Sequence, residues 1–124
     1  VYFPDLKTVH GGDLLHGTAP FIDYGNGGTS RGWVGTMNNI LSLDFDTAIP
    51  GHGVVMNRRD VLNFRNQMES VRHRMANLIR NGLDADDAPE EIRDGNLSWT
   101  QAENGLFMQR SIPGFYEEIS AELD

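Results

Sequence analysis

Apolar residues between positions 61 and 78 recur at alternating spacings of three and four, which is the period of an amphipathic α-helix. This apolar stripe consists of Val61, Phe64, Met68, Val71, Met75 and Leu78. Asn57 is a good N-cap, and Gly82 is a natural stop after the last turn. The pattern therefore predicts one long helix between Asn57 and Gly82.

Shorter apolar stripes predict further helices. The first begins near Ser30, with Thr29 or Ser30 as its N-cap, and ends around Leu43-Asp44. Its apolar face is formed by Trp33, Met37, Ile40 and Leu41. A last amphipathic helix is predicted for Ile112 to Leu123, and a short helix is predicted to begin at Pro89.

Short β-type segments lie before the long helix. Val1 to Phe3 and Thr8 to His10 predict a hairpin, the second strand of which stops at Gly11-Gly12. Residues 14–28 are rich in glycine and contain a proline, so a long loop is expected there. Thr47 to Ile49 predicts a short buried strand. The order of hairpin, helix, strand and helices predicts an α/β fold in which a short β-sheet packs against helices.

Size and charge limit the possible partners. The 124 residues suit one domain, which we take to span residues 1–124. The net charge is −8, from 10 basic and 18 acidic residues. An acidic surface of this kind argues against nucleic acid or an anionic membrane as a partner. Such a surface is most simply a solvated one, and its negative charge would also attract divalent cations.

The absence of cysteine decides which metal sites are possible. Without cysteine the chain can have no disulfide, no thiolate zinc site and no cysteine nucleophile. A metal site would have to use histidine and carboxylate, which suits zinc, iron or manganese.

The chain shows no targeting or membrane signal. No apolar run approaches the length needed to span a bilayer, and no signal peptide opens the sequence. We therefore expect a cytoplasmic protein. The sequence begins at Val1 inside an apolar segment and without methionine, which suggests a fragment or a processed start.

Two segments about forty residues apart each end a predicted strand in a glycine-rich turn. One is V-H-G-G-D-L-L-H, which contains Asp13, and the other is A-I-P-G-H-G, which contains His52. A carboxylate and an imidazole at two strand ends of one sheet can converge on one metal ion. Each segment also has a simpler interpretation, because P-G-H-G can be a turn with a surface histidine and G-G-D can be a turn closed by an aspartate hydrogen bond.

The two segments and the sequence between them closely resemble the C-terminal half of the metallo-β-lactamase superfamily. The resemblance is carried by G-D-L-L-H-G, P-F-I-D-Y-G-N-G-G and W-V-G-T-M-N-N-I-L-S-L-D-F-D-T-A-I-P-G-H-G, and it covers nearly the whole chain. It implies half of an αββα sandwich. It also implies that Asp13 is the carboxylate bridging two metal ions and that His52 is a ligand of the second metal.

The chain departs from the family in one large respect. The H-x-H-x-D-H segment, which supplies most ligands of the first metal, is absent. We therefore expect a fragment of a zinc-type hydrolase acting on a small molecule, which is incomplete or inactive alone. A homodimer or a missing N-terminal half would complete it. The alternatives are a non-catalytic binding or interaction module on the same scaffold, and an unrelated α/β domain with a coincidental P-G-H-G.

Several other polar residues could contribute to the site. His16, Asp23 and Tyr24 follow the metal segment and could face a substrate cleft. A packed loop histidine is the simpler interpretation of His16, and a loop-capping aspartate is that of Asp23. We expect His10 to have a structural role and His73 to lie exposed on the polar side of the long helix.

Overall fold

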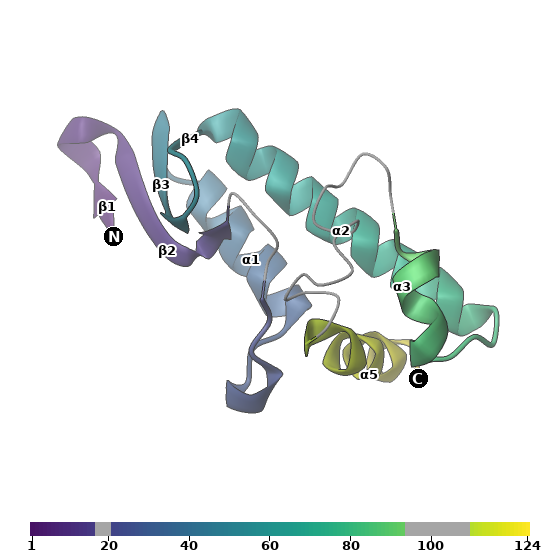
Figure 1. Ribbon diagram of the computed structural model, residues 1–124. Helices are drawn as coiled ribbons and strands as arrows, with labels where there is room; N and C mark the ends of the chain where they lie inside the picture. The colour runs from purple at the N-terminus through teal and green to yellow at the C-terminus, as the bar shows by residue number, and fades with distance from the viewer. Residues whose placement is uncertain (17–20, 94–109) are drawn as a thin grey trace.

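The computed structural model describes residues 1–16, 21–93 and 110–124, with His16 by its backbone alone, and shows a mixed α/β fold (Figure 1). Its four-stranded sheet has the order β1-β2-β3-β4. The strands are β1 (Tyr2–Phe3), β2 (Thr8–His16), β3 (Thr47–His52) and β4 (Met56–Asn57). The central pair, β2 and β3, is parallel, and each outer strand is antiparallel to its neighbour.

The predicted N-terminal hairpin is confirmed, because Tyr2 pairs with Val9 and Phe3 with Thr8. The prediction that its second strand stops at Gly11-Gly12 is wrong. Gly12 adopts a φ of 55°, and the pairing with β3 shifts register on either side of it, so β2 bends there and continues. The first residues of the predicted loop 14–28 therefore belong to a strand, and residues 17–20 of that loop lie outside the described residues.

The strand predicted at Thr47 to Ile49 is also longer than expected. β3 runs through Pro50 and Gly51 to His52. The short strand β4 was not predicted at all, since two residues carry no periodicity. Because β3 extends to His52, this residue lies at the end of a strand, directly beside β2.

The long helix α2 (Arg58–Arg80) matches its prediction closely. Asn57 and Asp60 form a reciprocal capping box at its start. Gly82 follows its end with a φ of 79°, which favours glycine. All six residues of its apolar stripe are buried.

Helix α1 (Ser30–Leu41) begins where predicted, and Thr29 accepts a hydrogen bond from Gly32 N as its N-cap. It ends slightly earlier than the predicted Leu43-Asp44. The guanidinium of Arg58 donates to the carbonyl oxygens of Leu41 and Leu43, which satisfies the open end of the helix. A contact from the start of α2 thus fixes the last turn of α1.

The described residues form two further α-helices, α3 and α5. α3 (Ala88–Glu91) contains Pro89 in its first turn, as predicted. α5 (Ile112–Leu123) buries Ile112, Phe115 and Ile119, whereas Leu123 at its end is 36% exposed.

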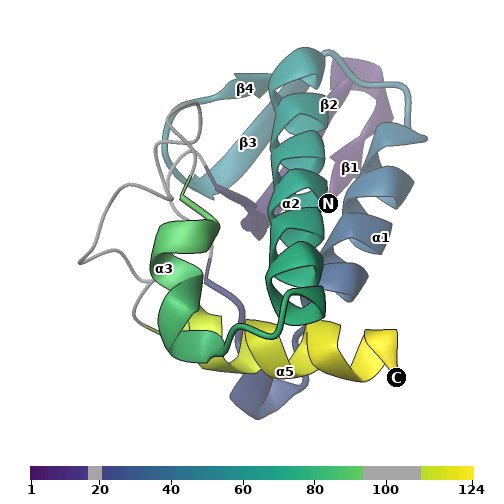
Figure 2. The same cartoon turned by 90° about the vertical axis from the view of Figure 1, so that its right-hand side faces the viewer.

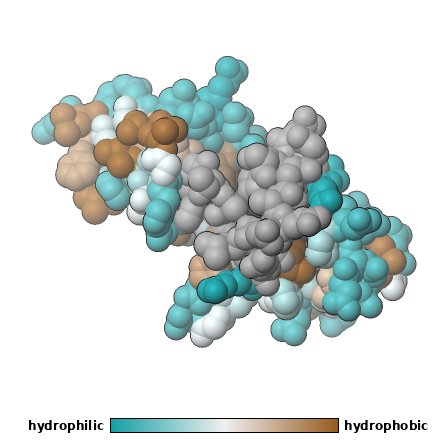
Figure 3. Space-filling model, in the orientation of Figure 1, coloured by the Kyte–Doolittle hydropathy of each residue, from teal (hydrophilic) through white to brown (hydrophobic). Residues whose placement is uncertain are grey.

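Helices α1 and α2 lie on one face of the sheet, whereas α3 and α5 pack against α2 at the end away from the sheet (Figures 1 and 2). Side chains on that face, such as Val9, Ala48 and Met56, are buried. Thr47 and Ile49, which alternate with buried residues along β3, are only half-buried. No described element covers this second face, and apolar residues gather over the sheet end of the molecule (Figure 3).

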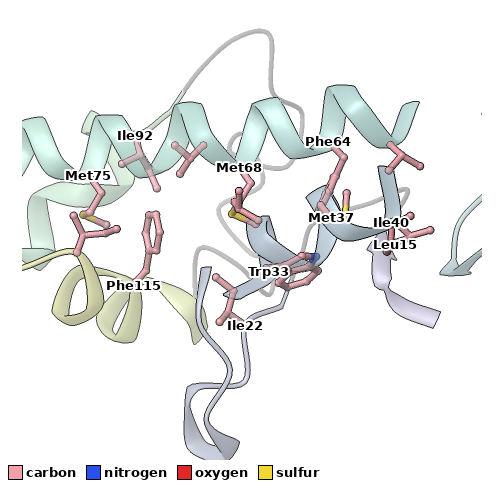
Figure 4. Close-up of a cluster of buried hydrophobic side chains, with 14 of the residues drawn as sticks. Leu15, Ile22, Trp33, Met37, Ile40, Phe64, Met68, Met75, Ile92 and Phe115 are labelled. Atoms are coloured by element: carbon pink, nitrogen blue, oxygen red, sulfur yellow. The ribbon is translucent and has the colours of Figure 1, made fainter. Parts of the chain in front are cut away.

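The core lies between the helices, and between the helices and the sheet (Figure 4). Trp33 of α1 packs against Phe64 of α2, with ring centroids 6.0 Å apart. Phe115 of α5 is fully buried near Met75 and Ile92 (Figure 4). Among the described helices, none combines the length and the hydropathy that a membrane span requires.

Candidate functional site

The parallel pairing of β2 and β3 brings the two predicted metal ligands together. His10 pairs with Ile49, Gly12 with Pro50, and the backbone of His16 with His52. Asp13 was expected just after a strand, but it lies inside β2, directly after the bend at Gly12. His52 ends β3 on the neighbouring strand. The site is therefore built at the carboxyl ends of adjacent parallel strands, where ligands of α/β proteins commonly bind.

Asp13 and His52 are in direct contact. Oδ1 of Asp13 lies 2.8 Å from Nδ1 of His52. Their side chains are 69% and 68% exposed, respectively, so both remain open to solvent. A pair with this much exposure adds little to stability.

Gly51 permits this close approach. A Cβ atom at position 51 would collide with Oδ1 of Asp13 and would lie 2.8 Å from the carbonyl carbon of Gly12. Only a residue without a side chain lets β3 pass so near the bend in β2. Gly51 thus allows the close packing of the two strands, and Gly12 allows the bend in β2.

A carboxylate and an imidazole are a suitable donor set for zinc, iron or manganese. Their 2.8 Å separation is that of a direct hydrogen bond, so the two side chains would have to move slightly apart to hold a metal ion. Within the described ranges, however, no three histidine or acidic side chains are grouped closely enough to hold a metal ion. The two residues therefore fit as part of a metal site, and the remaining ligands would have to come from elsewhere.

The other histidines lie apart from this pair or cannot be placed. His10 is exposed, and its Nδ1 accepts a hydrogen bond from Gly12 N, so it supports the bend in β2. His73 is 79% exposed on α2, with Glu69 3.9 Å away, which confirms the prediction of a surface residue. The side chain of His16 lies outside the described residues, so its predicted place in a cleft stays a prediction.

A pocket of about 470 Å³ opens beside Asp13, which is one of its lining residues. Its apolar wall includes Leu14, Phe21, Ile22 and Trp33. The indole Nε1 of Trp33 donates to the carbonyl oxygen of Leu14 at 2.7 Å, which joins α1 to β2 along this wall. A concave, mostly apolar pocket next to a polar pair is typical of a small-molecule site.

The two loop residues predicted to shape a cleft have different environments. Asp23 lines the pocket, and its Oδ2 accepts a hydrogen bond from the side chain of Asn26 at 2.7 Å. Its carbonyl oxygen accepts from the backbone N–H groups of Asn26 and Gly28, so it also closes the loop. Tyr24 is not among the described residues that line the pocket, and its hydroxyl donates to Glu118 at 2.6 Å.

Glu118 of α5 is the centre of a charged cluster behind the pocket. Its Oε1 accepts hydrogen bonds from Tyr24 and from both the backbone N–H and the hydroxyl of Ser30, and its Oε2 accepts from Arg31 N and from Arg72. The side chains of Arg72 and Glu118 are 14% and 10% exposed. The cluster therefore joins α5 and α2 to the start of α1, where the pocket-lining loop ends.

The environment shifts the pKa of two members of the cluster. Burial opposes ionisation of Glu118, but hydrogen bonds from Tyr24 and from the backbone of Arg31 and Ser30 outweigh it and lower the pKa of the carboxyl. Burial, together with the neighbouring carboxylate of Glu118, raises the pKa of Tyr24 well above its usual range. Tyr24 therefore stays protonated as a donor, and Glu118 stays charged as an acceptor.

Sequence reasoning did not identify this cluster. Glu118 and Ser30 are 88 positions apart, and no local spacing connects them. The helix carries three glutamates, Glu117, Glu118 and Glu122, and no sequence pattern singles out Glu118.

Comparison with known proteins gives no further assignment. The chain matches no protein-family model, and a search of curated proteins finds no significant relative. Any functional conclusion therefore depends on the residues of the site.

Proposed function

We propose that this chain is the C-terminal half of a metal-dependent hydrolase similar to the metallo-β-lactamase superfamily. Asp13 would be the bridging carboxylate, and His52 would be a ligand of the second metal. The observation that carries the proposal is the 2.8 Å contact between these two side chains at the ends of adjacent parallel strands. Zinc is the first candidate metal, and iron or manganese would suit the same donors.

The bound metals would activate water for attack on an ester, thioester, lactam or phosphoester. The residues of this chain would supply the rest of their half-site. Asp13 and His52 are exposed and held beside each other, so they can take up a metal without opening the core. The neighbouring pocket would receive the substrate, and Trp33 would form part of its apolar wall.

The uncovered face of the sheet supports a partner that completes the site. Within the described residues, helices cover only one face of the sheet, and large apolar side chains are exposed around the sheet. These side chains include Val1, Phe3, Leu6, Val54 and Val55. An uncovered apolar face is costly in water. A second copy of this chain or a separate N-terminal half would cover it and bring the missing ligands.

Zinc titration by calorimetry tests the metal half of the proposal. We expect zinc binding by the purified chain, with affinity lowered at least about tenfold in both Asp13→Asn and His52→Asn. His73→Asn is the matched control, because it removes an exposed histidine far from the pair in sequence and fold. Equal affinities in all four proteins would overturn the proposed ligand roles.

Light scattering after size-exclusion chromatography tests the homodimer. We expect a dimer, favoured by added zinc if two copies share ligands. A well-folded monomer with and without zinc would exclude a homodimer and leave a separate N-terminal half as the partner.

A non-catalytic binding module is the second candidate. The observation that favours it is the lack, within the described residues, of a group of three metal-capable side chains. This candidate predicts that Asp13→Ala and His52→Ala change neither stability nor metal content. Zinc- or manganese-dependent esterase or phosphodiesterase turnover that is lost in the same variants would refute it.

A further inference from the structure

We infer that the pocket beside Asp13 binds a small organic cation, which packs an apolar ring against Trp33 and places its ammonium group at Asp23. The inference deepens the proposed function by naming a substrate class. It depends on that function only for the ligand being a substrate, since binding itself requires no metal.

The apolar part of the ligand follows from the pocket wall. The pocket holds about 470 Å³, which is within the usual range for small-molecule sites. Phe21 and Leu14 are 37% and 42% exposed, although both are large apolar residues. Together with Trp33 they offer an aromatic and aliphatic surface that a ring-sized group would cover.

The charge of the ligand follows from the polar residues of the pocket. Among its described lining residues, the charged side chains are Asp13 and Asp23, and there is no lysine or arginine. Asp13 is committed to the proposed metal pair through His52. Asp23 remains, and within the described part of the chain its Oδ1 accepts no hydrogen bond. A carboxylate in this position favours a cationic group and disfavours an anionic one.

The start of α1 could have reversed this preference, because a helix N-terminus attracts anions. Thr29 and Gly32 of this helix end line the pocket. Its free N–H groups are already satisfied, however. Ser30 N and Arg31 N donate to Glu118, and Gly32 N donates to the hydroxyl of Thr29. The carboxylate of Glu118 thus occupies the anion site of the helix from behind, and the pocket is left without a positive group.

Binding of three matched probes tests the inference. They are 2-naphthylmethylamine, 2-naphthylmethanol and 2-naphthoate, which share a ring and differ in charge. Fluorescence of Trp33 would report binding in a Trp99→Phe background, with EDTA present so that no metal contributes. We expect the amine to bind about tenfold more tightly than the carboxylate, with the alcohol between them.

Substitution of Asp23 then tests the assigned residue. Asp23→Asn should weaken binding of the amine about fivefold and leave the alcohol unchanged. Asp5→Asn is the control, because it removes the same charge from an exposed site outside the described pocket lining. Carboxylate binding as tight as amine binding would overturn the inference, and so would equal effects of Asp23→Asn and Asp5→Asn. Failure of zinc titration would refute the proposed function alone, because these probes are measured without metal.

Discussion

Replacing Glu118 by glutamine removes the charge at the centre of the cluster while preserving its shape. The carboxylate accepts five hydrogen bonds, three of them from the side chains of Tyr24, Ser30 and Arg72. A glutamine amide replaces one acceptor oxygen by a donor, so either orientation places donor against donor. Arg72, which is 14% exposed, also loses the charge of one carboxylate partner and keeps only Glu122.

The expected cost follows from these losses. Hydrogen bonds to charged groups contribute about 1.5–3 kcal/mol each, and breaking a buried ion pair costs about 3–5 kcal/mol. Since these terms overlap, we expect the free energy of unfolding to fall by about 3–5 kcal/mol. Domains of this size have a total of about 5–15 kcal/mol, so the loss would be a large fraction of it.

Urea unfolding followed by circular dichroism measures this loss, with Glu117→Gln as the matched control. Glu117 is the preceding residue on α5 and is exposed, so its substitution should change stability by less than about 0.5 kcal/mol. The two variants carry the same change in net charge. A loss below about 1 kcal/mol in Glu118→Gln, or equal losses in both variants, would refute the structural role of the cluster.

The pH dependence gives a second readout of the same residue. The pKa of Glu118 is lowered from its usual value of 4.5, so its stabilising contribution is complete above that value. It is lost as the pH falls through the lowered pKa of the folded protein. The difference in stability between wild type and Glu118→Gln should therefore be largest near neutral pH and should shrink in acid. A difference that does not change with pH would contradict the lowered pKa.

Four further substitutions test local packing and helix capping. Gly114→Ala should destabilise the protein by about 1–3 kcal/mol in urea unfolding, because the new Cβ would lie 2.6 Å from Cγ of Tyr24. Gly35→Ala on α1 is the control, because its new Cβ would meet no atom within 4 Å; it should be neutral or stabilising by up to about 1 kcal/mol. Gly51→Ala should displace Asp13 from His52, which would appear as changed histidine resonances in nuclear magnetic resonance spectra; unchanged resonances would argue against the collision. Asn57→Ala removes the cap of α2 and should cost about 1 kcal/mol of unfolding free energy, and a neutral effect would show that the capping box is dispensable.

The elements that sequence predicted well are those with a local signal. The apolar stripe of α2 spans about five turns, and Asn57 and Gly82 mark the ends of the helix, so periodicity and capping agree. The end of α1 was less accurate because Arg58, from another helix, satisfies its carbonyls. The continuation of β2 past Gly12 was missed because glycines also occur at strand ends, and only the pairing with β3 shows which case applies.

The candidate site could likewise be predicted only in part. The resemblance to a family identified Asp13 and His52, and the structure brings these two side chains into contact. The apolar pocket and the Glu118 cluster could not be predicted, since both combine residues from segments far apart in the chain. The metal role of the pair stays a prediction.

The parallel pairing of β2 and β3 has a consequence for folding kinetics. Asp13 and His52 are separated by 39 positions, and α1 lies between them in the chain. Closing a loop of this length costs about 3 kcal/mol in chain entropy, and no local turn can bring the ends together. In the unfolded chain the pair is therefore together in about 1% of molecules or fewer. A metal that needs both residues would bind the native state alone, so adding it should slow unfolding and leave early collapse unchanged.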